Sequence, residues 1–357
     1  MKKFLLTLIA PLALGFTACT EDENPDSPID PVAQPRIAYV LNQGSMFSGI
    51  DGTMDIMSLV DSTYVSNAFA AINGQRLGDS PQAGIIYGSK LYVAMFGSNL
   101  VWVLDSKTLR ALSSIPTKEP EGICASEGCI YVSNNDGFVS RIDTTQLKVT
   151  AQMPVGPNPQ HMLAVGSKVY VSISDGYNSA NNYKNGFRVV ELDGLRFEKM
   201  AEYTVGMNPG PLAADAMGQI YVACRGNYND VAPKVWRIQG EQASEFCDGS
   251  DVEVCGDRLY VVYNYTNWSV TPPKTILTYK VYNTNTSQCI NSALLEGQPQ
   301  PEVPIFLDIN PQNGDLYIGS YASAADYTSP GFLWHYNAEG QFISKQQTGV
   351  APCAVIF

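Results

Sequence analysis

The sequence predicts an all-β fold made of seven similar four-stranded units that close into a ring. Three observations support this prediction. The chain of 357 residues is rich in Tyr (20), Gly (30) and Pro (22), and only 16% of its residues are charged. A short strand motif recurs at a regular spacing, and the two ends of the chain carry complementary parts of one unit. A Tyr-rich, turn-rich and charge-poor composition favours strands over helices.

The recurring motif is an apolar residue followed by Tyr and then by Val or Ile. Its seven copies are Ala38–Val40, Leu91–Val93, Ile130–Val132, Val169–Val171, Ile220–Val222, Leu259–Val261 and Leu316–Ile318. Consecutive tyrosines are 53, 39, 39, 51, 39 and 57 residues apart, so the basic period is close to 39 residues. A period of about 40 residues with several short strands in each unit is typical of a β-propeller.

The third unit shows how four strands arise. Ile130–Val132 is followed by the loop SNNDG, by Phe138–Asp143 and then by Leu147–Met153, which is apolar at alternate positions, as expected for a strand with one buried face. A Pro-containing turn and the apolar segment HMLAVG then lead into the next unit. Because the repeated Tyr lies in mid-strand in every unit, we expect it to pack between blades rather than to bind a ligand.

The chain ends complement each other. The sequence GVAPCAVIF at the C-terminus is an inner turn and strand with no unit after it, whereas the repeats begin with a second strand that has no first strand before it. We therefore expect Cys353–Phe357 to pair with Ile37–Leu41 and to close the ring, since an open array leaves strand edges exposed. Deletion of the last seven residues should then abolish folding or solubility.

Residues 36–357, with their strand motifs, the turn GPNPQ and the four-strand period, resemble the YVTN-type seven-bladed propellers. Before them, Lys2 and Lys3 precede the apolar stretch Phe4–Ala18, so residues 1–18 are expected to be a signal peptide. That stretch leads to Cys19 in GFTAC, which resembles the lipobox of bacterial lipoproteins, in which the Cys is lipidated. Residues 19–35 are acidic and Pro-rich, and we expect a disordered tether.

Taken together, these features resemble the surface lipoproteins of Bacteroidetes that have a propeller fold. Some of them capture cobalamin (vitamin B12) and pass it to a TonB-dependent outer-membrane transporter. The resemblance implies a protein that is lipid-anchored in the outer membrane, exposed on the cell surface, and able to bind a corrinoid. An ordinary cleaved signal peptide with a coincidental Cys is the alternative.

Composition and motif content argue against several other functions. The net charge of −12 disfavours a nucleic-acid partner, and without a polybasic segment the membrane is expected to be reached through the N-terminal lipid alone. The seven cysteines after Cys19 match no metal spacing, and we predict no specific disulfide. With His161 and His335 as the only histidines, neither a zinc cluster nor a catalytic triad is indicated. We expect no enzyme activity, no metal and no cofactor, although the acidic loop GIDGTMD has oxygen ligands suited to Ca²⁺.

Function is expected in the loops that follow the second strands, on the same face as the turns that lead into the inner strands. These loops are expected to account for much of the extra length of the first, fourth and sixth units, and the loop of the sixth unit is expected over Val262–Thr275. They are rich in Asn, Ser, Gly and Tyr, a composition typical of adaptable binding loops. Gln82 and Glu121 are expected beside the central opening, and His161 can equally be a structural histidine. The candidate ligand-binding residues are Asn42, Phe96, Asn134, Gln160, His161, Tyr177, Tyr183, Arg225, Tyr228, Tyr265, Trp268, Tyr321 and Tyr327.

Four functions remain open from the sequence. The first is capture of cobalamin or another corrinoid, because a large flat ligand edged with amides suits a face lined by Tyr, Trp, Asn and Gln. The second is a glycan-binding accessory lipoprotein, since aromatic platforms also suit sugars. The third is a propeller lyase or glycosidase that uses loop carboxylates, for which the candidates are Asp51, Asp55, Asp136, Asp175 and Asp230. The fourth is a protein-interaction scaffold.

Overall fold

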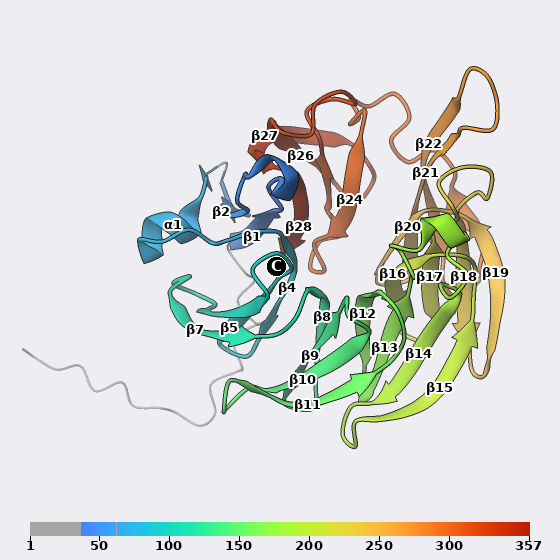
Figure 1. The fold of residues 1–357 in the computed structure, drawn as a ribbon. Helices are drawn as coiled ribbons and strands as arrows, with labels where there is room; N and C mark the ends of the chain where they lie inside the picture. Colours follow the sequence, from blue (N-terminus) through green and yellow to red (C-terminus); the bar gives the residue numbers. More distant parts are fainter. Residues whose placement is uncertain (1–36, 62) are drawn as a thin grey trace, which may run out of the picture. The chain divides into compact units, whose positions relative to one another are not determined.

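A computed structural model describes residues 37–61 and 63–357, which form seven four-stranded antiparallel sheets. The sheets are arranged radially as the blades of a ring (Figure 1). The predicted seven-bladed β-propeller with four strands per blade is thereby confirmed. The predicted signal peptide, Cys19 and the tether lie outside the described residues. Within residues 37–61 and 63–357, no helix is both long and apolar enough to cross a membrane.

Each blade runs from an inner strand near the axis to an outer strand at the rim. The inner strands are β28 (Pro352–Ile356), β4 (Pro81–Tyr87), β8 (Pro120–Ser126), β12 (Pro159–Val165), β16 (Pro209–Ala214), β20 (Asp251–Cys255) and β24 (Pro304–Ile309). The second strands are β1 (Ile37–Asn42), β5 (Lys90–Met95), β9 (Cys129–Asn134), β13 (Lys168–Ile173), β17 (Ile220–Cys224), β21 (Arg258–Asn267) and β25 (Leu316–Ser320). The third strands are β2 (Thr53–Ser58), β6 (Leu100–Asp105), β10 (Phe138–Asp143), β14 (Arg188–Asp193), β18 (Lys234–Gln239), β22 (Lys274–Asn283) and β26 (Pro330–Tyr336). The outer strands are β3 (Tyr64–Val65), β7 (Ala111–Pro116), β11 (Lys148–Pro154), β15 (Glu198–Thr204), β19 (Gln242–Asp248), β23 (Cys289–Asn291) and β27 (Phe342–Val350).

The Pro-containing turns of the repeat mark the start of the inner strands. Six of the seven inner strands begin with Pro, which fits a first strand position because it has no N–H to donate; β20 begins with Asp251 instead. In every blade except β20–β23, the residue that follows the second strand donates its backbone N–H to the residue before the inner strand, as Phe96 does to Ser80 at 2.8 Å and Arg225 does to Asn208 at 2.9 Å. These bonds place the inner turns and the second-strand loops on one face, as predicted.

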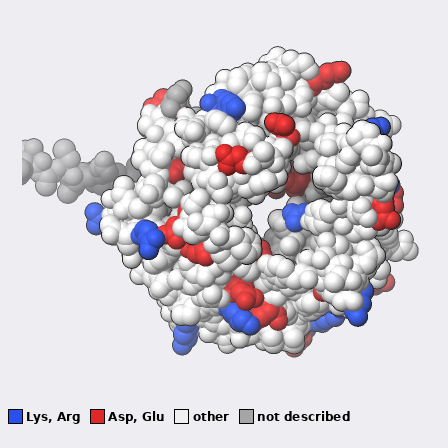
Figure 2. All heavy atoms as spheres, turned by 45° about the horizontal axis from the view of Figure 1, so that its top comes forward, with Lys and Arg blue, Asp and Glu red and all other residues white. Residues whose placement is uncertain are grey.

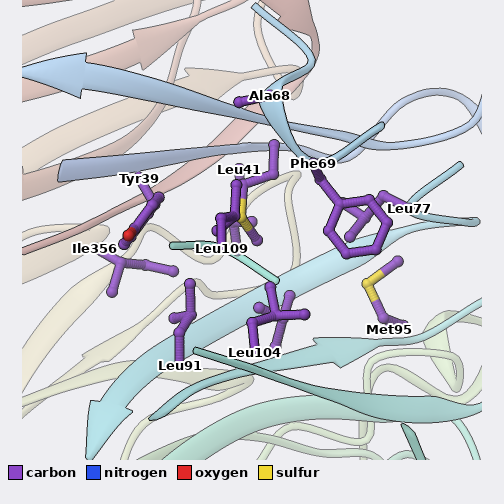
Figure 3. Close-up of a cluster of buried hydrophobic side chains, with 12 residues drawn as sticks. Tyr39, Leu41, Ala68, Phe69, Leu77, Leu91, Met95, Leu104, Leu109 and Ile356 are labelled. Atoms are coloured by element: carbon purple, nitrogen blue, oxygen red, sulfur yellow. The ribbon is translucent and has the colours of Figure 1, made fainter. Parts of the chain in front are cut away.

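The C-terminal strand closes the ring. In the antiparallel pair β1–β28, Tyr39 is opposite Ile356 and Val40 is opposite Val355, which confirms the predicted pairing of the two ends. The C-terminus lies beside β1 and β4 (Figure 1). Ile356 packs near Tyr39 and Leu91 in a buried cluster shared by the first two blades (Figure 3). Closure therefore covers both the backbone edge of β1 and apolar side chains.

The repeated tyrosines are structural, as expected. All seven are buried, with at most 5% of their surface exposed. The Tyr39 hydroxyl donates to the Ser106 carbonyl at 2.6 Å, and the Tyr131 hydroxyl donates to the Gly194 carbonyl, in each case in the following blade. In these two units the Tyr of the motif thus ties neighbouring blades together.

The longer units depart from the prediction in two places. In the first unit, the helix α1 (Ala68–Asn73) follows β3, so part of the extra length lies after the outer strand and not in the second-strand loop. Phe69 of α1 is fully buried, with its ring centroid 5.5 Å from that of Trp102. Segment 262–275, which was expected to be a loop, is mostly strand, because β21 and β22 pair over ten residues and form a projecting hairpin (Figure 1).

Two of the second-strand loops each contain a short 3-10 helix. They are η1 (Met46–Ser48) after β1 and η2 (Ser179–Asn181) after β13. Neither contains a buried residue. Both helices therefore belong to the exposed surface of the loop-bearing face.

Candidate functional site

Two adjoining hollows lie on the face formed by the second-strand loops and inner turns. The larger hollow has a volume of about 610 Å³ and is lined by residues of the three blades β16–β19, β20–β23 and β24–β27. The second hollow, of about 560 Å³, is lined mainly by residues of the inner strands and lies at the central opening. The two hollows share Arg225, Asp251, Ile305 and Phe306. Basic and acidic atoms are visible at the central opening (Figure 2).

Aromatic side chains make up much of the larger hollow. Those that line it are Tyr228, Tyr265, Trp268, Tyr279, Phe306 and Tyr321. Trp268 and Tyr228 are 62% and 54% exposed, whereas Tyr265 is buried and its hydroxyl donates to the Asn229 carbonyl at 2.8 Å. The last contact joins the long β21–β22 hairpin to the loop after β17. The hairpin therefore forms one wall of the hollow and carries Trp268 at its turn.

Arg225 lies where the two hollows meet, immediately after β17. Its Nη1 donates to Gln160 Oε1 at 3.4 Å, and its Nη2 lies 3.4 Å from His161 Nε2. A Cβ atom at position 210 would come within 3.1 Å of the guanidinium, so Gly210 leaves room for this side chain. Among the described residues, Arg225 is the only Lys or Arg that lines either hollow, and it makes no ion pair within 4 Å.

His161 supports Arg225. Burial, together with the positive charge of Arg225, lowers the pKa of His161 to about 3, so the imidazole is neutral at physiological pH. A neutral imidazole offers one ring nitrogen as an acceptor, and here that nitrogen is Nε2, which faces Arg225. Of the two interpretations left open for His161, the geometry favours a residue that holds Arg225 in place.

Carboxyl groups line the central opening. Burial raises the pKa of Glu121 to about 7, of Asp251 to about 6 and of Asp308 to about 7, and it also raises that of Glu253. The positive charge of Arg225 partly opposes the shift at Glu121 and at Asp251. Two of these groups also join inner strands, because Asp251 Oδ2 accepts from Leu307 N at 3.3 Å and Asp308 Oδ2 accepts from Val355 N at 2.6 Å.

The structure brings eight of the sequence-derived candidates to the two hollows. Arg225, Tyr228, Tyr265, Trp268 and Tyr321 line the larger one, and Gln160, His161, Tyr177 and again Arg225 line the central one. Gln82 and Glu121 also lie at the central opening, as expected. Tyr177 is 70% exposed, so its ring stands at the rim.

Five candidates lie elsewhere. Asn42 and Asn134 are buried inside their blades, where Asn42 Nδ2 donates to Asp55 Oδ2 at 2.8 Å and Asn134 Nδ2 donates to Thr117 Oγ1 at 2.6 Å, so both are structural. Tyr183 is buried beneath its loop, and Phe96 is half-buried; neither lines a hollow. Tyr327 also lies outside both hollows, but its ring packs edge-on against Tyr321, with centroids 4.7 Å apart.

Sequence reasoning missed Asp251, Tyr279 and Phe306. Asp251 lies in the one inner turn where the Pro motif is absent, and that departure was the available signal. Tyr279 is a mid-strand residue of β22, where nothing in the sequence separates a core Tyr from a cavity Tyr. The Tyr279 hydroxyl is buried and has no hydrogen-bond partner among the described residues.

The loop carboxylates considered for catalysis or Ca²⁺ are each engaged within their own part of the fold. Asp51 pairs with Arg76 at 2.6 Å, and Asp55 accepts from the Tyr64 hydroxyl at 2.6 Å. Asp175 accepts from Asn178 Nδ2 at 2.8 Å, Asp230 accepts from Asn227 Nδ2 at 2.7 Å, and Asp136 lies 3.9 Å from Lys118 Nζ. In residues 37–61 and 63–357, no group of three or more His, Cys, Asp or Glu is placed to hold a metal ion, and all seven cysteines there are unpaired.

Comparisons with known proteins agree on the fold. No protein-family model matches the chain, and no curated protein matches its sequence. A quinoprotein alcohol dehydrogenase-like protein from Bacteroides thetaiotaomicron is 16% identical with a TM-score of 0.61, over 90% of this chain and 77% of that one. Hydrazine synthase from Kuenenia stuttgartiensis is 15% identical with a TM-score of 0.60, over 77% of this chain and 89% of that one.

A computationally designed protein, Ika8, is also similar. It is 13% identical with a TM-score of 0.54, over 85% of this chain and 83% of that one. At such low identities these likenesses show the fold alone.

Proposed function

We propose that this chain is a non-catalytic binding protein that captures a small or medium ligand on its loop-bearing face, with cobalamin or another corrinoid as the ligand. The observation that carries the proposal is the aromatic hollow of about 610 Å³ beside the central opening. Ligand sites typically measure about 300–1,000 Å³ and combine apolar or aromatic walls with a few polar groups. This hollow has such walls, with Arg225 and Asp251 at one end.

A large flat ligand suits the site because the two hollows adjoin. Arg225, Asp251, Ile305 and Phe306 line both, so one ligand can extend from the aromatic hollow over the central opening. Neutral hydrogen-bonding groups, among them Asn264, Thr266 and Gln160, are available to the amide edge of a corrinoid. Transfer of the ligand to a TonB-dependent outer-membrane transporter, from a lipid anchor at Cys19, is the remaining part of the proposal and follows from the sequence resemblance.

Glycan binding is the second candidate function. It is favoured by the exposed rings of Tyr177, Tyr228 and Trp268, which are 70%, 54% and 62% exposed around the hollows. Rings of this kind can stack on sugar faces. A glycan array with the purified full chain tests this candidate separately, and binding there without any corrinoid binding would move it to first place.

A desalting experiment tests corrinoid capture. The full chain is mixed with cyanocobalamin and passed through a desalting column, and we expect red colour to elute with the protein at about one equivalent. The melting temperature should rise too, since a ligand at 1,000 times its dissociation constant stabilises the native state by about 4 kcal/mol. A colourless protein peak and an unchanged melting temperature would contradict corrinoid capture.

A pair of exposed aromatics provides a matched control for the location. Trp268→Ala removes an exposed ring that lines the larger hollow, whereas Phe47→Ala removes a fully exposed ring that lines neither hollow. We expect Trp268→Ala to weaken binding by about tenfold or more and Phe47→Ala to leave it unchanged. Equal effects of the two substitutions would place the ligand elsewhere.

A further inference from the structure

The larger hollow is lined by one positive and one negative group. Arg225 and Asp251 are the only charged side chains among the described residues that line it, and the rest of its lining is aromatic, apolar or neutral. Both residues also line the central opening. The two charges thus lie in the wall that the hollows share.

Arg225 has N–H groups that no hydrogen bond among the described residues uses. A guanidinium carries five N–H groups, and the contacts at Gln160 and His161 use two of them at 3.4 Å each. Both partners are neutral acceptors, so the positive charge is not paired by a carboxylate within 4 Å in the described part of the chain. The side chain is therefore held in place and remains able to donate to a ligand.

Asp251 has carboxylate lone pairs that no hydrogen bond within the described part of the fold uses. Its Oδ1 accepts from Val252 N at 2.9 Å and its Oδ2 from Leu307 N at 3.3 Å. An ionised carboxylate has about four lone-pair positions, so two remain for a ligand. The two backbone bonds fix the orientation of the carboxylate in the wall.

Tyr279 adds a third polar group to the same hollow. It is only 3% exposed, and its hydroxyl has no partner in residues 37–61 and 63–357. A buried hydroxyl without a partner is unfavourable. This hydroxyl can either donate or accept.

We propose that the larger hollow selects ligands in which an aromatic or apolar body carries a neutral head group with an acceptor and a donor side by side, such as a primary carboxamide. The carbonyl oxygen accepts from Arg225, and an amide N–H donates to Asp251. Asp251 disfavours an anionic head, and Arg225 disfavours a cationic one. The inference rests on the proposed function in one respect only, namely that the hollow holds a ligand.

Three probes with one aromatic body test the selectivity. The full chain is titrated at pH 7.5 by calorimetry with indole-3-acetamide, indole-3-acetate and tryptamine, whose heads are neutral, anionic and cationic. We expect the acetamide to bind about tenfold or more tightly than either charged probe, because each charged head leaves one wall group without a partner. Equal affinities, tighter binding of a charged probe, or no binding of any probe would overturn the inference.

A matched pair of carboxylates separates recognition from structure. Asp251 and Asp308 each accept a backbone N–H from the next inner strand, but only Asp251 lines the larger hollow. We expect Asp251→Asn to reduce the preference for the acetamide over the acetate by about tenfold, since the repelling charge is removed, and Asp308→Asn to leave the preference unchanged. An equal change in both variants would assign Asp251 a purely structural role.

Cyanocobalamin separates this inference from the proposed function. If cyanocobalamin fails to bind but the probes follow the expected order, the head-group selectivity stands and the corrinoid identity fails. If cyanocobalamin binds but the probes show no preference, the selectivity fails and corrinoid capture stands.

Discussion

Ile356 provides a quantitative test of ring closure by the C-terminal strand. Its side chain is 6% exposed and lies in the cluster that joins the first two blades, with Leu91 and Tyr39 nearby (Figure 3). Its Cδ1 atom lies 2.3 Å from where a Cβ at Gly84 would be, so it packs directly on the β4 backbone. Replacement of a buried Ile by Ala lowers the free energy of unfolding by about 2–5 kcal/mol. Because Ile356 packs tightly on β4, we expect a loss of about 3 kcal/mol. That is a large part of the roughly 5–15 kcal/mol that stabilises a typical domain.

The assay is equilibrium unfolding in urea followed by intrinsic fluorescence. Ile343→Ala on β27 is the matched control, because Ile343 is 50% exposed and its truncation should cost about 0.5 kcal/mol or less. Ile356→Ala should lower the unfolding midpoint without changing the slope with urea. Equal midpoints for the two variants would refute closure by packing of β28 against the second blade.

Three further predictions follow from the same structure. Deletion of residues 351–357 removes β28 and should abolish soluble expression; a soluble product with an unchanged melting temperature would contradict closure. Burial raises the pKa of Glu121 and Asp308 to about 7, well above unfolded values near 4, and the lowered pKa of His161 offsets only one of these two groups, so the native state holds more protons between these limits. The free energy of unfolding should therefore fall as the pH rises from about 4 to 7, and urea unfolding at pH 5 and pH 7.5 checks the sign. Tyr265→Phe loses the bond to the Asn229 carbonyl, which should cost about 1 kcal/mol and speed hydrogen exchange in residues 226–233; unchanged exchange would show that this bond does not hold the loop.

The sequence contained enough information to predict the ring, its closure and the face that bears the hollows. The repeat spacing gives the number of units. The unmatched strands at the two ends predict closure, because one four-stranded blade is complete only when both ends of the chain contribute to it. The Tyr of the motif was correctly interpreted as structural. It occupies the same mid-strand position in every unit, and what all units have in common is the fold. Tyr39 and Tyr131 indeed bond to the following blade.

Details of the site were less accessible from sequence, for physical reasons. Asn42 and Asn134 have the same residue type as loop asparagines, but each ends a second strand and turns inward to bond within its blade. Tyr265 was expected in the loop after the second strand of its unit, yet cross-strand pairing of β21 with β22 continues to Asn267. Tyr279 becomes a cavity residue only through the packing of three blades, which no local pattern encodes.

Hydrogen exchange of the full chain with and without cyanocobalamin tests the central claim, that the aromatic hollow and its rim capture the ligand. We expect slower exchange in residues 226–233, 263–274 and 321–329, which carry Tyr228, Trp268 and Tyr321. The turns on the opposite face, such as residues 106–110, 144–147 and 194–197, should be unaffected. Protection confined to those turns, or no protection around the hollow, would contradict the account.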